Sequence, residues 1–141
     1  MSPIIQFSKR DLMRGKVIVP GWYRMKIESV GEQPAASKEG RSPSTNYPVE
    51  GTILYNADTG DKEFEGVAID WNFNSKAMGF ARGFLESLGE VPTEGKRYEL
   101  AAAEGKELDV FVENGIWQGR QVNRVEHKYR APRPVEGSGA A

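Results

Sequence analysis

The sequence contains no cysteine and a single histidine, His127. Disulfide bonds, thiolate nucleophiles and cysteine-based zinc sites are therefore excluded, and one chain cannot supply a metal site made of several histidines. Long hydrophobic runs are also missing, since no run of strongly apolar residues is longer than Val17 to Val19. Because a membrane-spanning helix needs about 20 apolar residues, we expect no transmembrane segment, no signal-peptide core and a soluble, intracellular protein.

An excess of positive charge is the third absence. The chain carries 19 Lys and Arg against 20 Asp and Glu, which gives a formal net charge of −1. Domains that bind nucleic acids are usually basic, so the overall charge does not by itself indicate such a function. A local groove of positive charge can still bind a polyanion, and the distribution of Lys and Arg therefore matters more than their sum.

What is present indicates one β-rich domain. A length of 141 residues is typical of a single domain, and 16 glycines with 8 prolines fit a chain with many turns. Tyr23, Met25 and Ile27 alternate with polar residues, which is typical of a strand with one buried face. Similar patterns predict five strands in all, over residues 22–30, 47–57, 64–73, 108–113 and 116–129.

A helix is predicted between the third and fourth strands. Met78, Ala81, Phe84, Leu85 and Leu88 recur at steps of three and four residues, which is the spacing of one helical face, and we expect that face in the core. Suitable capping residues flank this segment, namely Asn74 or Ser75 as the N-cap and Gly89 just after the C-terminus. The segment 92–105 has no clear pattern, and residues 100–103 are compatible with a short helical turn.

The strongest hairpin signal is Asn114-Gly115, because a type I′ turn needs positive φ at both of its central residues. The element order is then three strands, a helix and two strands. That order predicts a mainly β fold, a five-stranded Greek-key barrel of the OB type with one α-helix between strands 3 and 4. We divide the chain into an N-terminal arm with a short strand (1–19), the barrel domain (20–130) and a disordered tail (131–141).

Several short stretches have a characteristic order and spacing, at residues 20–23, 37–45, 72–74, 84–89, 105–110 and 119–125. Taken together they resemble the phage-encoded OB-fold single-stranded DNA-binding proteins, over residues 4 to 130. The resemblance implies sequence-nonspecific binding of single-stranded DNA in phage replication or recombination, in the cytoplasm of the bacterial host cell. It implies replication or recombination proteins as further partners, no membrane and no cofactor, and it leaves a homodimer open.

Binding of single strands without sequence preference needs aromatic rings that stack on bases and cations that meet phosphates. Such side chains fall on outward positions of the first and last strands, and two cations lie in the polar stretch 31–46. The candidate nucleic-acid-binding residues are Trp22, Arg24 and Lys26 on the first strand, Lys38 and Arg41 in the polar stretch, Tyr55 on the second strand, and Trp117, Arg120, Arg124 and Lys128 in the last hairpin.

Each candidate also has an ordinary structural interpretation. Trp22 and Trp117 can pack in the barrel, because large aromatic residues are usually well buried. Trp71 follows the inward register of its strand, which favours the core. If the aromatic residues are buried, or exposed without surrounding cations, the chain is instead a structural or protein-interaction β-barrel without nucleic-acid binding.

Nothing in the sequence predicts an enzyme. It contains no P-loop, no GxSxG motif and no dinucleotide-binding fingerprint. Asp58, Asp61 and Glu63 lie close together, but the glycine and terminal glutamate of a calcium loop are missing, which favours a turn with solvated acids. We therefore predict a binding protein with no catalytic residues, no metal and no cofactor.

Overall fold

The computed structural model describes residues 2–13, 15–35 and 43–134. Its main feature is a six-stranded sheet in which all neighbouring strands are antiparallel. The strands are β1 (Gly21–Val30), β2 (Gln33–Pro34), β3 (Thr45–Asn56), β4 (Ala68–Asn74), β5 (Glu107–Trp117) and β6 (Arg120–Arg130). The helices are α1 (Lys9–Met13), α2 (Met78–Ser87) and the 3-10 turn η1 (Leu100–Ala103).

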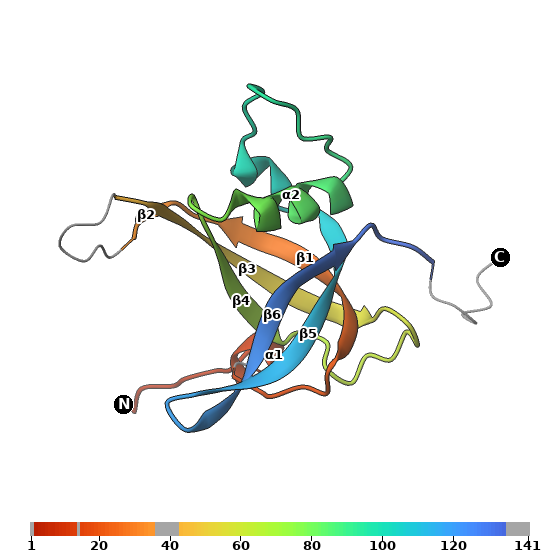
Figure 1. Ribbon diagram of the computed structural model, residues 1–141. Coiled ribbons are helices and arrows are strands. Elements are labelled where there is room, and N and C mark those ends of the chain that lie inside the picture. The colour runs from red at the N-terminus through yellow and green to blue at the C-terminus, as the bar shows by residue number, and fades with distance from the viewer. Residues whose placement is uncertain (1, 14, 36–42, 135–141) are drawn as a thin grey trace.

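The sheet curls into a barrel-like shape around β1, which pairs with β3 on one side and with β5 on the other. β3 also pairs with β4, and β5 with β6. The two outer strands then approach each other, and the ring centroids of Phe73 on β4 and His127 on β6 are 5.4 Å apart (Figure 1). No ladder joins β4 to β6 in the described part of the chain, so a seam remains between them.

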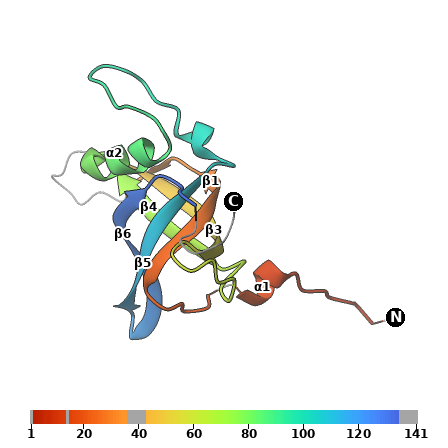
Figure 2. The ribbon, with the colours of Figure 1, turned by 90° about the vertical axis from the view of Figure 1, so that its right-hand side faces the viewer.

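The core confirms the predicted alternation. Tyr23, Met25 and Ile27 are buried on the inner face of β1, and Trp71 on β4 is only 8% exposed. α2 covers the end of the barrel at which β6 ends, where Phe84 meets Tyr129 with ring centroids 5.5 Å apart (Figure 2). None of the described helices is long and apolar enough to cross a membrane.

The predicted helix is confirmed, but its start and one core position were wrong. Ala81, Phe84 and Leu85 are buried, whereas Met78 is 45% exposed. The N-cap position is Ala77, because the two predicted capping residues have other partners. The Asn74 side chain donates to Asn46 Oδ1 at 2.8 Å and Ser75 Oγ accepts from Thr45 N–H at 2.9 Å, so both residues tie the end of β4 to β3. Gly89 ends the helix with φ +89°, as expected.

The turn of the β5–β6 hairpin lies at Gln118-Gly119, not at the predicted Asn114-Gly115. Both turn residues have positive φ, 50° and 76°. β5 continues through Asn114-Gly115 because contacts with distant residues hold both residues in extended conformation. The Asn114 side chain donates to Ile18 C=O at 2.9 Å, and the absence of a side chain at Gly115 leaves room for the Arg124 guanidinium. The hairpin is therefore longer than predicted.

Other expectations differ from the structure or lie outside it. The third predicted strand, 64–73, is observed as β4 and begins only at Ala68, because residues 63–66 form a turn. The helix α1 stands in the arm where we expected a short strand, and the two-residue strand β2 lies within the polar stretch 31–46, where no strand was predicted. The helical turn at residues 100–103 is confirmed as η1. Of the predicted disordered tail, residues 131–134 are described without regular structure, and residues 135–141 lie outside the described residues.

A substitution at Gly51 in β3 tests how tightly the barrel core is packed. An added Cβ would lie 2.9 Å from Met25 Cε and 3.3 Å from the Trp71 ring. Because both neighbours are buried, we expect Gly51→Ala to lower the free energy of unfolding by roughly 1–3 kcal/mol through overpacking. Urea denaturation followed by tryptophan fluorescence measures this loss.

Gly115→Ala is the matched control on a strand. Its Cβ would meet only the guanidinium of the exposed Arg124, at 2.8 Å, and that flexible side chain can move away. We expect a change within about 0.5 kcal/mol. Equal losses for the two variants would contradict the packing described for Gly51.

Candidate nucleic-acid interface

The outward faces of β1, β5 and β6 form a continuous surface that we call the outer stripe. Leu108, Val110 and Val112 of β5 are fully buried, so the alternate positions of that strand face outward. Register places Trp22 opposite Phe111, and Trp117 opposite Arg120. The outer stripe comprises Trp22, Phe111, Glu113, Gly115, Trp117, Arg120, Val122, Arg124, Lys128 and Arg130.

Half-buried rings in the middle of the outer stripe hold cations above them. Trp22 and Phe111 contact each other edge to face, with ring centroids 5.4 Å apart. The Arg130 guanidinium lies 4.3 Å from the Trp22 centroid, and Lys128 Nζ lies 5.2 Å from the Phe111 centroid. Such cation–π contacts stabilise the cations in fixed positions. One face of the predicted residue Trp22 is therefore covered by the Arg130 guanidinium.

The hairpin tip carries the most exposed ring of the stripe. Trp117 is 62% exposed, and its cross-strand partner Arg120 is exposed as well. Arg124 is exposed further along β6, with its Nε 3.8 Å from a Glu126 carboxylate oxygen. Lys128 Nζ lies 3.8 Å from Glu113. Ion pairs this long and this exposed hold their cations weakly.

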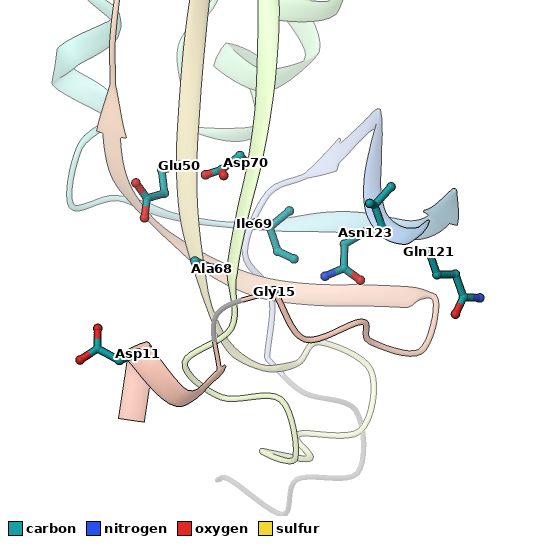
Figure 3. A pocket seen from close by; sticks show the side chains of 9 residues that line it. Asp11, Gly15, Glu50, Ala68, Ile69, Asp70, Gln121 and Asn123 are labelled. Atoms are coloured by element: carbon teal, nitrogen blue, oxygen red, sulfur yellow. The ribbon is translucent and has the colours of Figure 1, made fainter. Parts of the chain in front are cut away.

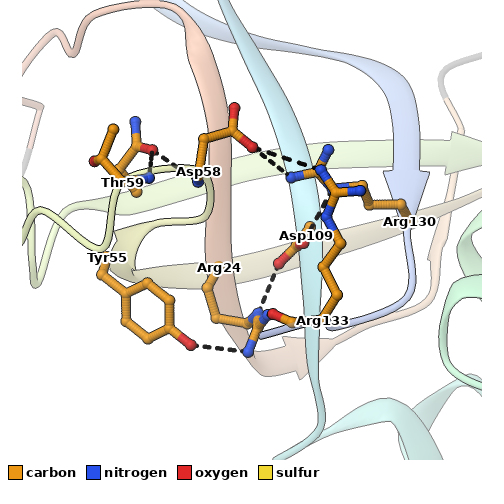
Figure 4. Close-up of polar contacts among 8 residues, drawn as sticks. Arg24, Tyr55, Asp58, Thr59, Asp109, Arg130 and Arg133 are labelled. Carbon is orange, nitrogen blue, oxygen red and sulfur yellow. Dashed lines mark hydrogen bonds and ion pairs between the residues drawn. The ribbon is translucent and has the colours of Figure 1, made fainter. Parts of the chain in front are cut away.

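Arg24 was predicted to face solvent, and this prediction was wrong. Its side chain is buried and its Nε donates to the fully buried Asp109 carboxylate at 2.6 Å (Figure 4). Its remaining donors bind the Tyr55 hydroxyl at 2.8 Å and the Arg133 carbonyl at 2.6 Å. Arg130 Nε donates to the second Asp109 oxygen at 3.1 Å. A buried charge needs a partner, and Asp109 therefore draws both arginines inward.

The other predicted residues fall into three groups. Lys26 is exposed on β1, opposite Glu107. Tyr55 is half-buried, with its hydroxyl engaged by Arg24. Lys38 and Arg41 lie outside the described residues.

One ring and one cation of the stripe, Phe111 and Arg130, were missed by sequence reasoning. Phe111 alternates with two buried valines, a pattern that could have identified it as outward-facing. For Arg130, no local signal was available, because its partners come from distant segments. Hydrogen bonds to Asp58 and Asp109, and the charges of both acids, outweigh the opposing effect of burial and raise the pKa of Arg130 above its ordinary value.

Aromatic residues in the seam between β4 and β6 belong to the core. Trp71, Phe73, Phe84 and Tyr129 pack together with ring centroids 5.2 to 6.3 Å apart. Burial raises the pKa of the Tyr129 hydroxyl, which is the expected direction for a phenol removed from water. These rings fill the barrel and offer no free face to a base.

His127 lies at the edge of this cluster. It has φ +58° within the irregular pairing of β5 and β6, and its ring stacks on Phe80 with centroids 4.4 Å apart. It is half-buried, and this burial lowers the pKa of its imidazole. A neutral ring is the form that packs well among aromatic neighbours.

A polar pocket of about 330 Å³ opens at the other half of the seam (Figure 3). Carboxylates from three elements line it, namely Asp11 on α1, Glu50 on β3 and Asp70 on β4, with Gln121 and Asn123 on the β6 side. Within the described residues, no three acidic, histidine or cysteine side chains are grouped closely enough to hold a metal ion. Acidic side chains repel phosphates, so this pocket does not suit a nucleic-acid backbone.

No protein-family model matches the chain, and no curated protein matches it. The function must therefore be inferred from the residues of the outer stripe and their surroundings.

The buried Asp109 carboxylate generates a stability prediction. Asp109→Asn removes the charge that compensates Arg24 and Arg130, and we expect the free energy of unfolding to fall by roughly 3–5 kcal/mol. Glu86→Gln on α2 is the control, because its ion pair with Arg82 is exposed and should contribute only about 0.3–0.5 kcal/mol. Chemical denaturation of both variants tests this. A loss at Asp109 as small as that at Glu86 would mean that the buried network does not hold the fold.

Proposed function

We propose that the chain is an OB-type barrel that binds single-stranded DNA without sequence preference, in phage replication or recombination. The outer stripe carries this proposal, because it combines an exposed tryptophan with several cations on one face. The OB assignment draws support from the order of the five long strands, with α2 between the third and the fourth, and from β1 pairing on both sides.

Trp117 is the ring we assign to base stacking. Its 62% exposure leaves room for a base, and stacking of one base on an aromatic side chain contributes about 1–3 kcal/mol. Arg120, Arg124 and Lys128 follow along β6 and would contact phosphates at intervals along the bound strand. Trp22 and Phe111 position the cations Arg130 and Lys128 through cation–π contacts.

The distribution of charge supports binding at the stripe despite the net charge of −1, because cations outnumber the one acid of the stripe, Glu113. The cations Arg120, Arg124 and Lys128 lie on the outer stripe, whereas Glu50 and Asp70 lie opposite each other on β3 and β4 and line the pocket in the seam. A polyanion is attracted to the stripe and repelled from the seam, and this gives the strand a defined path.

Titration of a fluorescein-labelled oligo-dT of about thirty bases tests the proposal, since one OB barrel covers about 4–16 nucleotides. We expect saturable binding by anisotropy, quenching of tryptophan emission and weakening with salt, with a slope of about −0.7 in log–log form per phosphate contacted. Absence of binding at low salt would contradict the proposal and favour the protein-interaction barrel, for which the exposed Ile116 beside Trp117 is the supporting feature.

Two variants locate the site. Trp117→Ala should weaken binding by about 5- to 150-fold through the lost stacking. Arg120→Glu should weaken it too and reduce the salt dependence. Arg97→Glu makes the same change of charge in the loop between α2 and η1, at the other end of the barrel from the hairpin (Figure 1). If Arg97→Glu weakened binding as much as Arg120→Glu, the ligand would not be bound on the outer stripe.

A further inference from the structure

Asp58, in the turn after β3, is held by two arginines at the end of the outer stripe (Figure 4). Its Oδ1 accepts from Arg130 Nη2 at 2.8 Å and lies 3.7 Å from Arg133 Nη2. The Asp58 side chain is 51% exposed and that of Arg133 57% exposed, so the carboxylate sits at the surface, not within the core.

The two acids that Arg130 contacts differ in their accessibility. Asp109 is fully buried and occupies the guanidinium Nε, whereas Asp58 occupies the outer nitrogen Nη2. Asp109 could not be displaced by a ligand without opening the core. Asp58 is exposed and lies in a turn, where its backbone N–H donates to Asn56 Oδ1 at 2.9 Å.

Guanidinium groups that hold a carboxylate can also hold a phosphate, because two oxygens of either anion can accept parallel hydrogen bonds from the planar guanidinium fork. Arg130 is already fixed by its stacking on Trp22 and by Asp109, so a phosphate entering here would meet a pre-positioned donor. The site continues the line of cations that begins at Arg120 and passes through Arg124 and Lys128 along β6.

We propose that Arg130 and Arg133 form a phosphate subsite for the bound strand, and that Asp58 occupies this subsite in the free protein as an internal competitor. The inference rests on the proposed function and deepens it. The DNA strand must displace Asp58 to reach the two arginines. The displaced carboxylate stays nearby, and its negative charge offsets part of the attraction between the arginines and the phosphate. The wild-type protein therefore binds more weakly, and with less salt dependence, than its arginines would allow.

Asp58→Asn tests the competition directly in the full chain. We expect its affinity for oligo-dT to rise about tenfold, the effect of one charge-assisted pair, and its salt slope to steepen by about 0.7. Glu63→Gln is the matched control, because it removes one negative charge from the same exposed loop away from the two arginines. Screening limits the gain in affinity from that change to about twofold.

Arg133→Ala completes a double-mutant cycle and checks that the gain comes from the subsite. It should have little effect on affinity in the wild type and should remove most of the gain in the Asp58→Asn background. Thermal melts of each variant verify folding, since Asp58 forms only exposed or half-exposed pairs. If the wild type binds and Asp58→Asn gains no more than Glu63→Gln, the internal competitor is excluded while the proposed function stands. If no variant binds oligo-dT, the proposed function fails, and the subsite fails with it.

Discussion

The interaction on which the rest of this structure depends is the buried carboxylate of Asp109. It accepts hydrogen bonds from Arg24 on β1 and from Arg130 on β6, and so ties three adjacent strands together on their outward side. Arg24 in turn binds the Arg133 carbonyl, which fixes the segment that follows β6. An unpaired charge at this depth would be strongly destabilising, so Arg24 and the Nε of Arg130 are committed to the fold.

That commitment shapes the candidate site. Cations at the centre of the outward face neutralise Asp109 or rest on half-buried rings, so the freely exposed ones lie toward the hairpin, at Arg120 and Arg124. The hairpin extends beyond the barrel because Asn114 and Asn123 bind the backbone of residues 16–18 along its inner side. This extension carries Trp117 away from the core and leaves its ring exposed.

The sequence pattern predicted what depends on local periodicity. The inner face of β1, the burial of Trp71 and most of the α2 face follow from alternation or helical spacing, and the structure confirms them. Prediction failed where a distant partner decides. Arg24 has the spacing of an outward residue, but its partner Asp109 is 85 residues away.

The prediction of the hairpin turn failed for the same reason. Asn114-Gly115 has the residue types of a type I′ turn, yet contacts with Ile18 and Arg124 keep it extended. The turn lies instead at Gln118-Gly119, which also adopts positive φ at both positions. The observed turn makes Trp117 and Arg120 cross-strand partners, and Arg124 lies four residues further along β6, so all three side chains share one face.

The central claim is that single-stranded DNA binds on the outer stripe at Trp117. The chain has three tryptophans, in three different environments, and their indole N–H signals report on them separately. Addition of unlabelled oligo-dT to ¹⁵N-labelled protein, followed by ¹H–¹⁵N NMR, therefore tests the claim most directly. We expect the Trp117 signal to shift most, Trp22 less and the buried Trp71 hardly at all. An unchanged Trp117 signal at saturating DNA would contradict the claim.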